Sequence, residues 1–166
     1  SKEAGEQAVR TTNPRHAILR TAWLVSAHGS NFVKTMLRLG AERPLVRVVN
    51  DQRGSPTSAA DLADALARIA LRMIADPAAP TGTFHFVNAG ATTWHGFAEA
   101  IFAAAAKAGR PVPRLEPIGT ADYPTAAKRP AYSCLSSASL EAAWGVRPRP
   151  WQTALADVLA ELLAAG

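Results

Sequence analysis

Hydrophobic and polar positions along the chain follow helical and strand periodicity in turn. Helical spacing of apolar residues predicts helices over residues 1–12, 30–40, 58–75, 93–107, 137–143 and 150–165. Short apolar runs predict strands over residues 16–25, 45–49, 83–88 and 115–118. Alternation of strands with helices indicates an α/β architecture with parallel strand pairing.

Local signals place the ends of several helices. Ser30 is expected to cap the second helix and Gly40 to end it. Ser58 is expected to cap the third, with Asp61 at the position of a capping-box acid. That third helix carries its apolar stripe at Leu62, Leu66, Ile69 and Met73. Between these helices, residues 51–56 form a polar loop.

The strand over residues 16–25 and one later strand look buried on both faces, as in a parallel sheet. Two strands do not make an independent doubly wound sheet, so they resemble the last strands of a larger one. The first helix also begins at residue 1 without a capping sequence. We therefore expect the chain to start inside an element.

Composition narrows the function classes. The chain is 48% hydrophobic, enough for a sizeable core, and its net charge is +5. The basic residues are scattered, so no nucleic-acid partner is expected. Their positive charge would attract phosphorylated small molecules. An arginine-rich composition without functional meaning explains the same charge equally well. One cysteine, Cys134, excludes an internal disulfide, and no apolar run is long enough to span a membrane. The expected location is cytoplasmic.

Residues 1–9 read Ser-Lys-Glu-Ala-Gly-Glu-Gln-Ala-Val. They resemble the end of the Tyr-Gly-x-Ser/Thr-Lys-x-x-Gly-Glu segment of extended short-chain dehydrogenases/reductases, with Ser1, Lys2, Gly5 and Glu6 matching. The resemblance places the tyrosine four residues before Lys2, ahead of the first residue. Residues four apart share a helix face, so the ammonium would lower the pKa of the phenol and let it exchange a proton near neutral pH.

Further strings resemble the dTDP-4-dehydrorhamnose reductase branch of this superfamily. They occur in order and at compatible spacing at residues 20–25, 28–36, 48–57, 60–63, 82–85 and 94–98. The block Asp-Gln-Arg-Gly-Ser-Pro-Thr at residues 51–57 favours the reductase branch over epimerases or dehydratases of the superfamily. Each string alone is weak evidence for the family, but together the strings occur in the same order as in the family and cover nearly the whole chain.

The resemblance implies the C-terminal portion of a Rossmann-like doubly wound parallel sheet plus a small α/β substrate-binding subdomain. Residues 1–110 would hold the remaining Rossmann-type elements with interleaved substrate-binding segments, and residues 111–166 mainly the substrate-binding subdomain. No glycine-rich phosphate-binding loop is present in the sequence. We expect the chain to be part of a longer enzyme and inactive alone.

The implied reaction transfers hydride from NADPH or NADH to the 4-keto group of a dTDP-linked 6-deoxy sugar. Lys2 would tune the tyrosine and orient the nicotinamide ribose. Thr21 and Leu24 would lie beside the nicotinamide, chiefly through backbone groups. Trp23 would pack against the deoxysugar, because an indole offers an apolar face and one N–H donor; the alternative is a core tryptophan.

The remaining implied substrate contacts lie in loops and at helix starts. Asn31 and Phe32 open a helix whose free N–H groups favour a polar ligand, although a cap and a core phenylalanine explain them equally well. Gln52, Ser55 and Thr57 lie in the polar loop, where a turn role is at least as plausible. Arg129, within Lys-Arg-Pro, is expected on the diphosphate.

One stretch departs from the family pattern, and several alternatives stay open. Family members usually read Asn-Ser-Arg-Leu-Asp where residues 132–136 read Tyr-Ser-Cys-Leu-Ser, so an arginine and an aspartate are absent. A non-catalytic nucleotide-binding subunit, or another sugar-nucleotide epimerase or dehydratase, is the alternative function. No metal site is expected; Mg²⁺ at Glu161 or Asp61 is possible but unsupported, and a homodimer is possible.

Overall fold

The computed structural model describes residues 1–125, 127 and 129–164. Its helices are α1 (Lys2–Thr12), α2 (Phe32–Glu42), α3 (Ala59–Ala75), α4 (Trp94–Lys107), α5 (Ala138–Trp144) and α6 (Trp151–Ala164), with a 3₁₀ turn at Thr120–Asp122. Its strands are β1 (Ala17–Arg20), β2 (Leu24–Val25), β3 (Leu45–Val49), β4 (Arg53–Gly54), β5 (Thr57–Ser58), β6 (Gly82–His85), β7 (Thr92–Thr93) and β8 (Arg114–Ile118). Among the residues described, no helix is both long and apolar enough to cross a membrane.

The strands associate in pairs, and each pair joins distant parts of the chain. β1 pairs with β6, β2 with β5 and β3 with β8, all parallel, while β4 pairs with β7 antiparallel. Parallel partners need long crossover connections, and helices supply them here. The predicted α/β class with parallel strands is confirmed.

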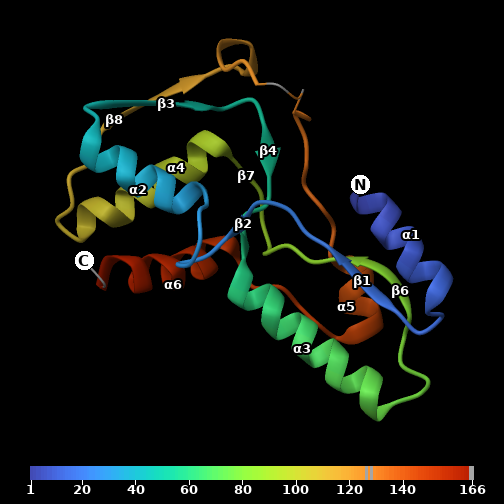
Figure 1. Cartoon of the computed structure of the whole chain (residues 1–166). Coiled ribbons are helices and arrows are strands. Elements are labelled where there is room, and N and C mark those ends of the chain that lie inside the picture. Colours follow the sequence, from blue (N-terminus) through green and yellow to red (C-terminus); the bar gives the residue numbers. More distant parts are fainter. Residues whose placement is uncertain (126, 128, 165–166) are drawn as a thin grey trace.

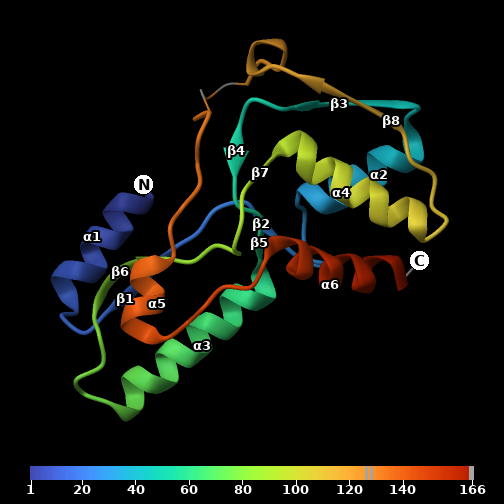
Figure 2. The same ribbon diagram turned by 180° about the vertical axis from the view of Figure 1, so that it is seen from behind.

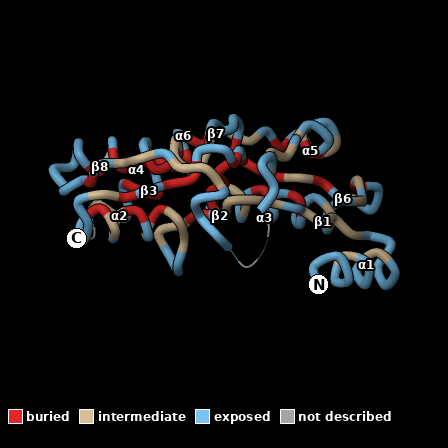
Figure 3. The backbone as a smooth tube through the Cα atoms, turned by 90° about the horizontal axis from the view of Figure 1, so that it is seen from above, coloured by how far each residue is buried: buried red, intermediate tan, exposed pale blue. Residues whose placement is uncertain are grey.

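Two hydrophobic cores stabilise the molecule, one at each end (Figures 1 and 2). The first core lies among α2, α4, α6 and β3, and its largest fully buried side chains are Phe97, Ile101 and Val33. The second core joins α3, α5 and β6 around Leu140, Ile69 and Phe84. Figure 3 shows buried backbone running along both, whereas α1 lies outside them and is mostly exposed. Because β8 pairs with β3, residues on both sides of position 110 share the first core; the division there stays a prediction.

The predicted strand over residues 16–25 is wrong as a single element buried on both faces. It divides into β1 and β2, and Trp23 between them has a φ of 50°. An L-residue in this left-handed region breaks the extended backbone. The residues of β1 are only half-buried, and its last residue, Arg20, is exposed.

Most predicted helix ends agree with the structure. Ser58 caps α3 by accepting from the Asp61 N–H, and Thr93 caps α4 by accepting from the Gly96 N–H. The cap of α2 is Asn31 rather than Ser30, because its amide oxygen accepts from two backbone N–H groups.

Three details of the helices and strands differ from expectation. Gly40 does not end α2; it lies within the helix, where an added Cβ would come within 3.0 Å of the Phe102 ring. The stripe on α3 is only partly covered, since Leu66 is 44% exposed. The strand expected over residues 83–88 is shorter, because β6 ends at His85.

Candidate functional site

A groove of about 1070 Å³ runs along the first core. Its aromatic end contains Trp23, Phe32 and Trp94. Gln52, Tyr123 and Arg129 also line the groove, together with residues of α2 and β3. A groove of this size with an apolar end and a few polar groups can hold a drug-sized polar ligand.

Three constraints hold Trp23 at the aromatic end. Its carbonyl accepts a hydrogen bond of 3.0 Å from the Thr57 N–H. The Trp94 ring stacks on its indole, with 3.5 Å between centroids and 11° between planes. Its ring also lies against Gly54, where an added Cβ would come within 2.3 Å of the indole. These contacts offset a left-handed backbone, which costs about 1–2 kcal/mol for an L-residue.

A hydrogen-bond network orders the middle of the groove. The carboxylate of Asp51 accepts from the Thr120 hydroxyl (2.6 Å) and the Thr120 N–H (2.9 Å). These bonds, the hydroxyl first, lower the pKa of Asp51 despite some opposing burial. Gln52 donates 3.0 Å to the same hydroxyl and is 8% exposed. The loop of residues 51–56 is thereby fixed to the segment after β8.

Three exposed arginines line the groove, namely Arg43, Arg47 and Arg129. Arg43 and Arg47 lie where α2 leads into β3, whereas Arg129 lies in the segment that pairs with Arg53. Guanidinium groups suit diphosphate oxygens because they donate in pairs. The contact of Arg129 with a diphosphate stays a prediction, and its neighbour Lys128 lies outside the described residues.

Lys2 lies at the end of α1 that meets the carboxyl end of β1. Arg20, the last residue of β1, is bonded to Glu6 at 2.7 Å and to Glu3 at 3.3 Å. The hydrogen bond from Arg20 has the largest effect and lowers the pKa of Glu6; burial opposes it, and the hydrogen bond from Arg10 lowers the pKa further. The helix thus holds Lys2 near the strand that leads to Trp23, and Lys2 itself is exposed.

Thr21 and Leu24 flank Trp23 on either side along the chain. Within the described part of the molecule, the Thr21 hydroxyl oxygen is buried and has no hydrogen-bond partner. A buried polar atom without a partner is unfavourable, so it marks a place where a ligand group can donate or accept. Leu24 is 48% exposed, and its backbone pairs with Thr57.

Three of the predicted substrate residues do not line the groove. The side chain of Asn31 is fully used as a cap, and its Nδ2 donates 2.7 Å to the Ser26 carbonyl. Ser55 and Thr57 are 3% and 0% exposed, and the Thr57 hydroxyl donates to the Ser55 carbonyl. A buried hydroxyl bonded within its own loop supports the backbone rather than a ligand. The turn and cap roles explain these three residues.

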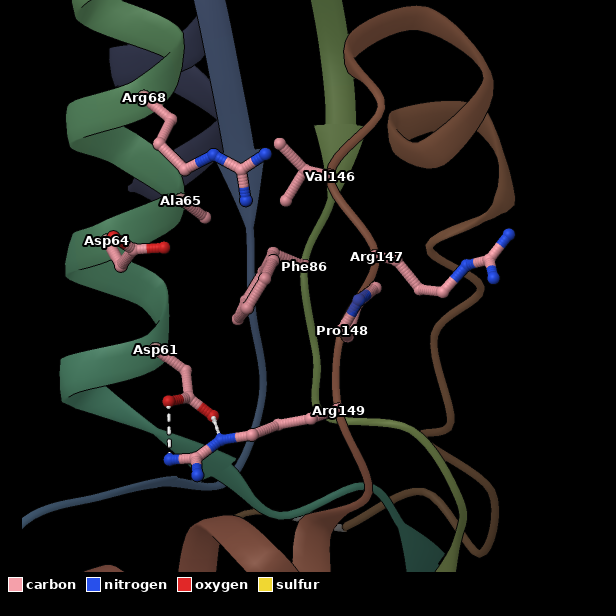
Figure 4. A pocket seen from close by; sticks show the side chains of 9 residues that line it. All are labelled: Asp61, Asp64, Ala65, Arg68, Phe86, Val146, Arg147, Pro148 and Arg149. Carbon is pink, nitrogen blue, oxygen red and sulfur yellow. Dashed lines mark hydrogen bonds and ion pairs between the residues drawn. The ribbon is translucent and has the colours of Figure 1, made fainter.

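A second, smaller pocket of about 240 Å³ lies between α3 and the segment before α6 (Figure 4). Arg149 bonds both oxygens of Asp61, at 2.8 and 2.9 Å, and Asp157 at 2.6 Å. Burial raises the pKa of Asp61, but the bonds from Arg149 and Asn88 outweigh it and leave the pKa lowered. Asp61 is therefore engaged in a structural ion pair.

The structure offers no cluster suited to Mg²⁺. Among the described residues, no three His, Cys, Asp or Glu side chains lie close enough together to hold a metal ion. Glu161 contacts the exposed His28 at 3.5 Å, and Asp61 is paired with Arg149. The expected absence of a metal stays a prediction.

Sequence reasoning missed the contribution of Trp94 to the groove. At the level of sequence, residues 94–98 count only as a family match. The available signal is that Trp94 directly follows the capping Thr93 and begins α4. Tyr123, Asp122 and Thr125 were also missed. They follow β8 in a proline-rich segment whose periodicity indicates no face, and only the pairing of β8 with β3 brings them to the groove.

Comparison with known proteins identifies close relatives. The family described as "RmlD substrate binding domain" matches residues 1–164. dTDP-4-dehydrorhamnose reductases of Aggregatibacter actinomycetemcomitans and Sinorhizobium fredii are 44% and 41% identical, over 96% and 100% of this chain and 55% and 56% of theirs. The chain thus spans about half the length of these curated relatives.

Solved structures agree with the sequence comparison. The dTDP-4-dehydrorhamnose reductase of Bacillus anthracis, in complex with NADP, superposes with a TM-score of 0.85 at 36% identity, covering 96% of this chain and 53% of that one. The reductase of Clostridium acetobutylicum gives a TM-score of 0.87 at 37% identity, covering 97% of this chain and 54% of that one. The fold described above is therefore half of the fold of those enzymes.

Proposed function

Because the chain belongs to the RmlD substrate binding domain family, we propose that it is the sugar-nucleotide-binding half of a dTDP-4-dehydrorhamnose reductase. The observation that carries the proposal is the groove of about 1070 Å³, which is lined by the indoles of Trp23 and Trp94 and by arginines. An indole face suits the C–H groups of a deoxysugar, and guanidinium groups suit its diphosphate. The names of the relatives support the same reaction.

The proposed reaction reduces the 4-keto group of dTDP-4-dehydro-6-deoxy-L-mannose to the hydroxyl of dTDP-L-rhamnose. NADPH or NADH would supply the hydride to C4 and would be released as the oxidised nucleotide. A tyrosine four residues before Lys2 would give its proton to the carbonyl oxygen. The Lys2 ammonium would stabilise the resulting phenolate.

The residues of this chain fit one side of a nicotinamide site. The buried Thr21 hydroxyl lacks a partner among the described residues, and it follows β1 directly, at the carboxyl end of a parallel strand. Ligands in parallel α/β sheets bind at such ends. Lys2 is held at the same end through the Arg20–Glu6 ion pair and would contact the ribose. The glycine-rich loop for the diphosphate would come from the other half of the enzyme.

The proposed substrate contacts are residues that line the groove. Trp23 would meet the deoxysugar, with Gln52 and Phe32 beside it, and Phe32 packs against Trp94 from α2. Arg129 would engage the diphosphate. The cytoplasmic location and a possible homodimer stay predictions.

Turnover by the whole reductase tests this function. The protein is mixed with dTDP-4-dehydro-6-deoxy-L-mannose and NADPH, then NADH, and loss of nicotinamide absorbance is followed. We expect consumption with either or both cofactors and formation of dTDP-L-rhamnose. A protein that binds the sugar nucleotide but consumes no cofactor, with the tyrosine intact, is instead a non-catalytic binding subunit.

A further inference from the structure

An unbroken series of aromatic rings connects the groove to the first core. Trp23 stacks on Trp94, and Trp94 lies 4.7 Å from the Phe32 ring, centroid to centroid. Phe32 stacks on Phe97 at 5.6 Å, and Phe97 meets Trp151 of α6 edge to face at 5.6 Å. Phe97 is fully buried, so the inner end of the series is fixed. Trp94 is the single aromatic link between Trp23 and that fixed end.

The position of the Trp23 ring is restricted from two sides. Trp94 covers one of its faces at 3.5 Å, which leaves no space for a ligand between the two indoles. Gly54 touches it near Cε2, Cζ2 and Nε1, where even a methyl group would overlap the ring. β4, which carries Gly54, pairs with β7, directly before Trp94. One short antiparallel ladder therefore sets both contacts together.

We propose that Trp94 is a positioning residue for the sugar, acting through Trp23 and supported by Gly54. This inference rests on the proposed function, because it assigns the sugar end of the groove. Trp94 fixes the orientation in which the free part of the Trp23 indole meets the deoxysugar. Without it, the ring can rotate, and its contact with the sugar is lost while the arginines that line the groove are unchanged.

This role predicts a selective effect on ligand binding. dTDP carries the base, the deoxyribose and the diphosphate but lacks the 6-deoxyhexose, so its affinity does not depend on the orientation of Trp23. dTDP-L-rhamnose adds the 6-deoxyhexose, so its affinity does depend on that orientation. Substitution of a residue that only supported the fold would lower the affinity for both ligands equally. The ratio of the two dissociation constants therefore separates positioning from general stability.

The test is calorimetric titration of the whole reductase with dTDP and with dTDP-L-rhamnose, without nicotinamide cofactor so that no turnover occurs. In Trp94→Leu, we expect affinity for dTDP-L-rhamnose to fall roughly tenfold and affinity for dTDP to stay within about twofold. Trp94→Phe keeps a ring in the stack and restores the ratio to within about threefold. Gly54→Ala displaces Trp23 without removing apolar area, so it reproduces the selective loss if Trp94→Leu fails to fold.

Trp144→Leu is the control, because Trp144 is an indole in the second core, away from the groove, and is more deeply buried than the partly buried Trp94. It is expected to lower stability without changing the ratio of the two constants. If Trp94→Leu and Gly54→Ala weaken both ligands equally, or weaken neither, the positioning role is refuted while the proposed function stands. If the unaltered reductase binds neither ligand, the proposed function itself fails.

Discussion

Asn88 joins three segments of the chain at the point where the two cores meet. Its Oδ1 accepts a 2.8 Å hydrogen bond from the Ser58 N–H, at the start of α3. Its Nδ2 donates to Asp61 at 2.7 Å and to the Arg149 carbonyl at 3.2 Å. The residue is 1% exposed, so water does not replace these partners when the side chain is removed. We therefore expect Asn88→Ala to be strongly destabilising.

The magnitude follows from what is left without a partner. Ser58 is 2% exposed, so its N–H would become a buried donor with no acceptor, which costs about 1–3 kcal/mol. The bond to the Asp61 carboxylate is charge-assisted and contributes about 1.5–3 kcal/mol. Asp61 keeps both bonds from Arg149, so the two losses are not fully additive. We expect the free energy of unfolding to fall by roughly 3 kcal/mol.

Urea unfolding, followed by far-ultraviolet circular dichroism, measures this change. Asn13→Ala is the control, because Asn13 is exposed and accepts only a local bond from the Arg15 N–H. We expect the control to change the free energy of unfolding by less than about 1 kcal/mol. A loss below about 1 kcal/mol in Asn88→Ala, with an unchanged denaturant slope, would refute the claim that this amide joins the cores.

Three further predictions concern charge and capping. The lowered pKa of Asp61 means that its stabilising effect is complete above its ordinary pKa of about 3.9 and is lost as pH falls through the lower native value. The difference in melting temperature between the protein and Asp61→Asn should therefore shrink below about pH 4 in thermal scans. Glu6→Gln removes the carboxylate that bonds Arg20, and because α1 buries no residue, amide hydrogen exchange should quicken in α1 and not in α4. Asn31→Ala should lower the free energy of unfolding by about 1 kcal/mol, measured in urea, whereas Asn31→Asp keeps the capping oxygen but loses the bond to the Ser26 carbonyl and should recover only part of that stability.

The sequence was sufficient for the helices and for the parallel α/β class. Their signals are local: a capping residue, a 3.6-residue period and a glycine or proline near the end. It also placed Trp23, Phe32, Gln52 and Arg129, all of which line the groove. Those positions came from resemblance to a family, since nothing in the periodicity distinguishes them from core or loop residues.

The rest depended on contacts between distant segments. Ser55 and Thr57 belong to a segment predicted as a polar loop, yet both are buried, and Thr57 lies in β5, which pairs with β2. Gly40 has the sequence signature of a helix end, yet it lies where α2 approaches Phe102 of α4. In each case a partner more than 30 residues away decides the outcome. Local patterns carry no information on such partners.

The backbone of Trp23 gives an argument for function that the sequence does not contain. A tryptophan that only filled a core could be accommodated in the extended region, without the cost of about 1–2 kcal/mol for a left-handed residue. Here the strain interrupts a strand and directs a half-buried indole into the groove, where Trp94, Gly54 and the Thr57 N–H hold it. Strained residues that the surrounding structure over-determines concentrate at binding sites. The two contacts to this ring and the hydrogen bond to its backbone carbonyl therefore favour a ligand role for Trp23 over the role of a core tryptophan.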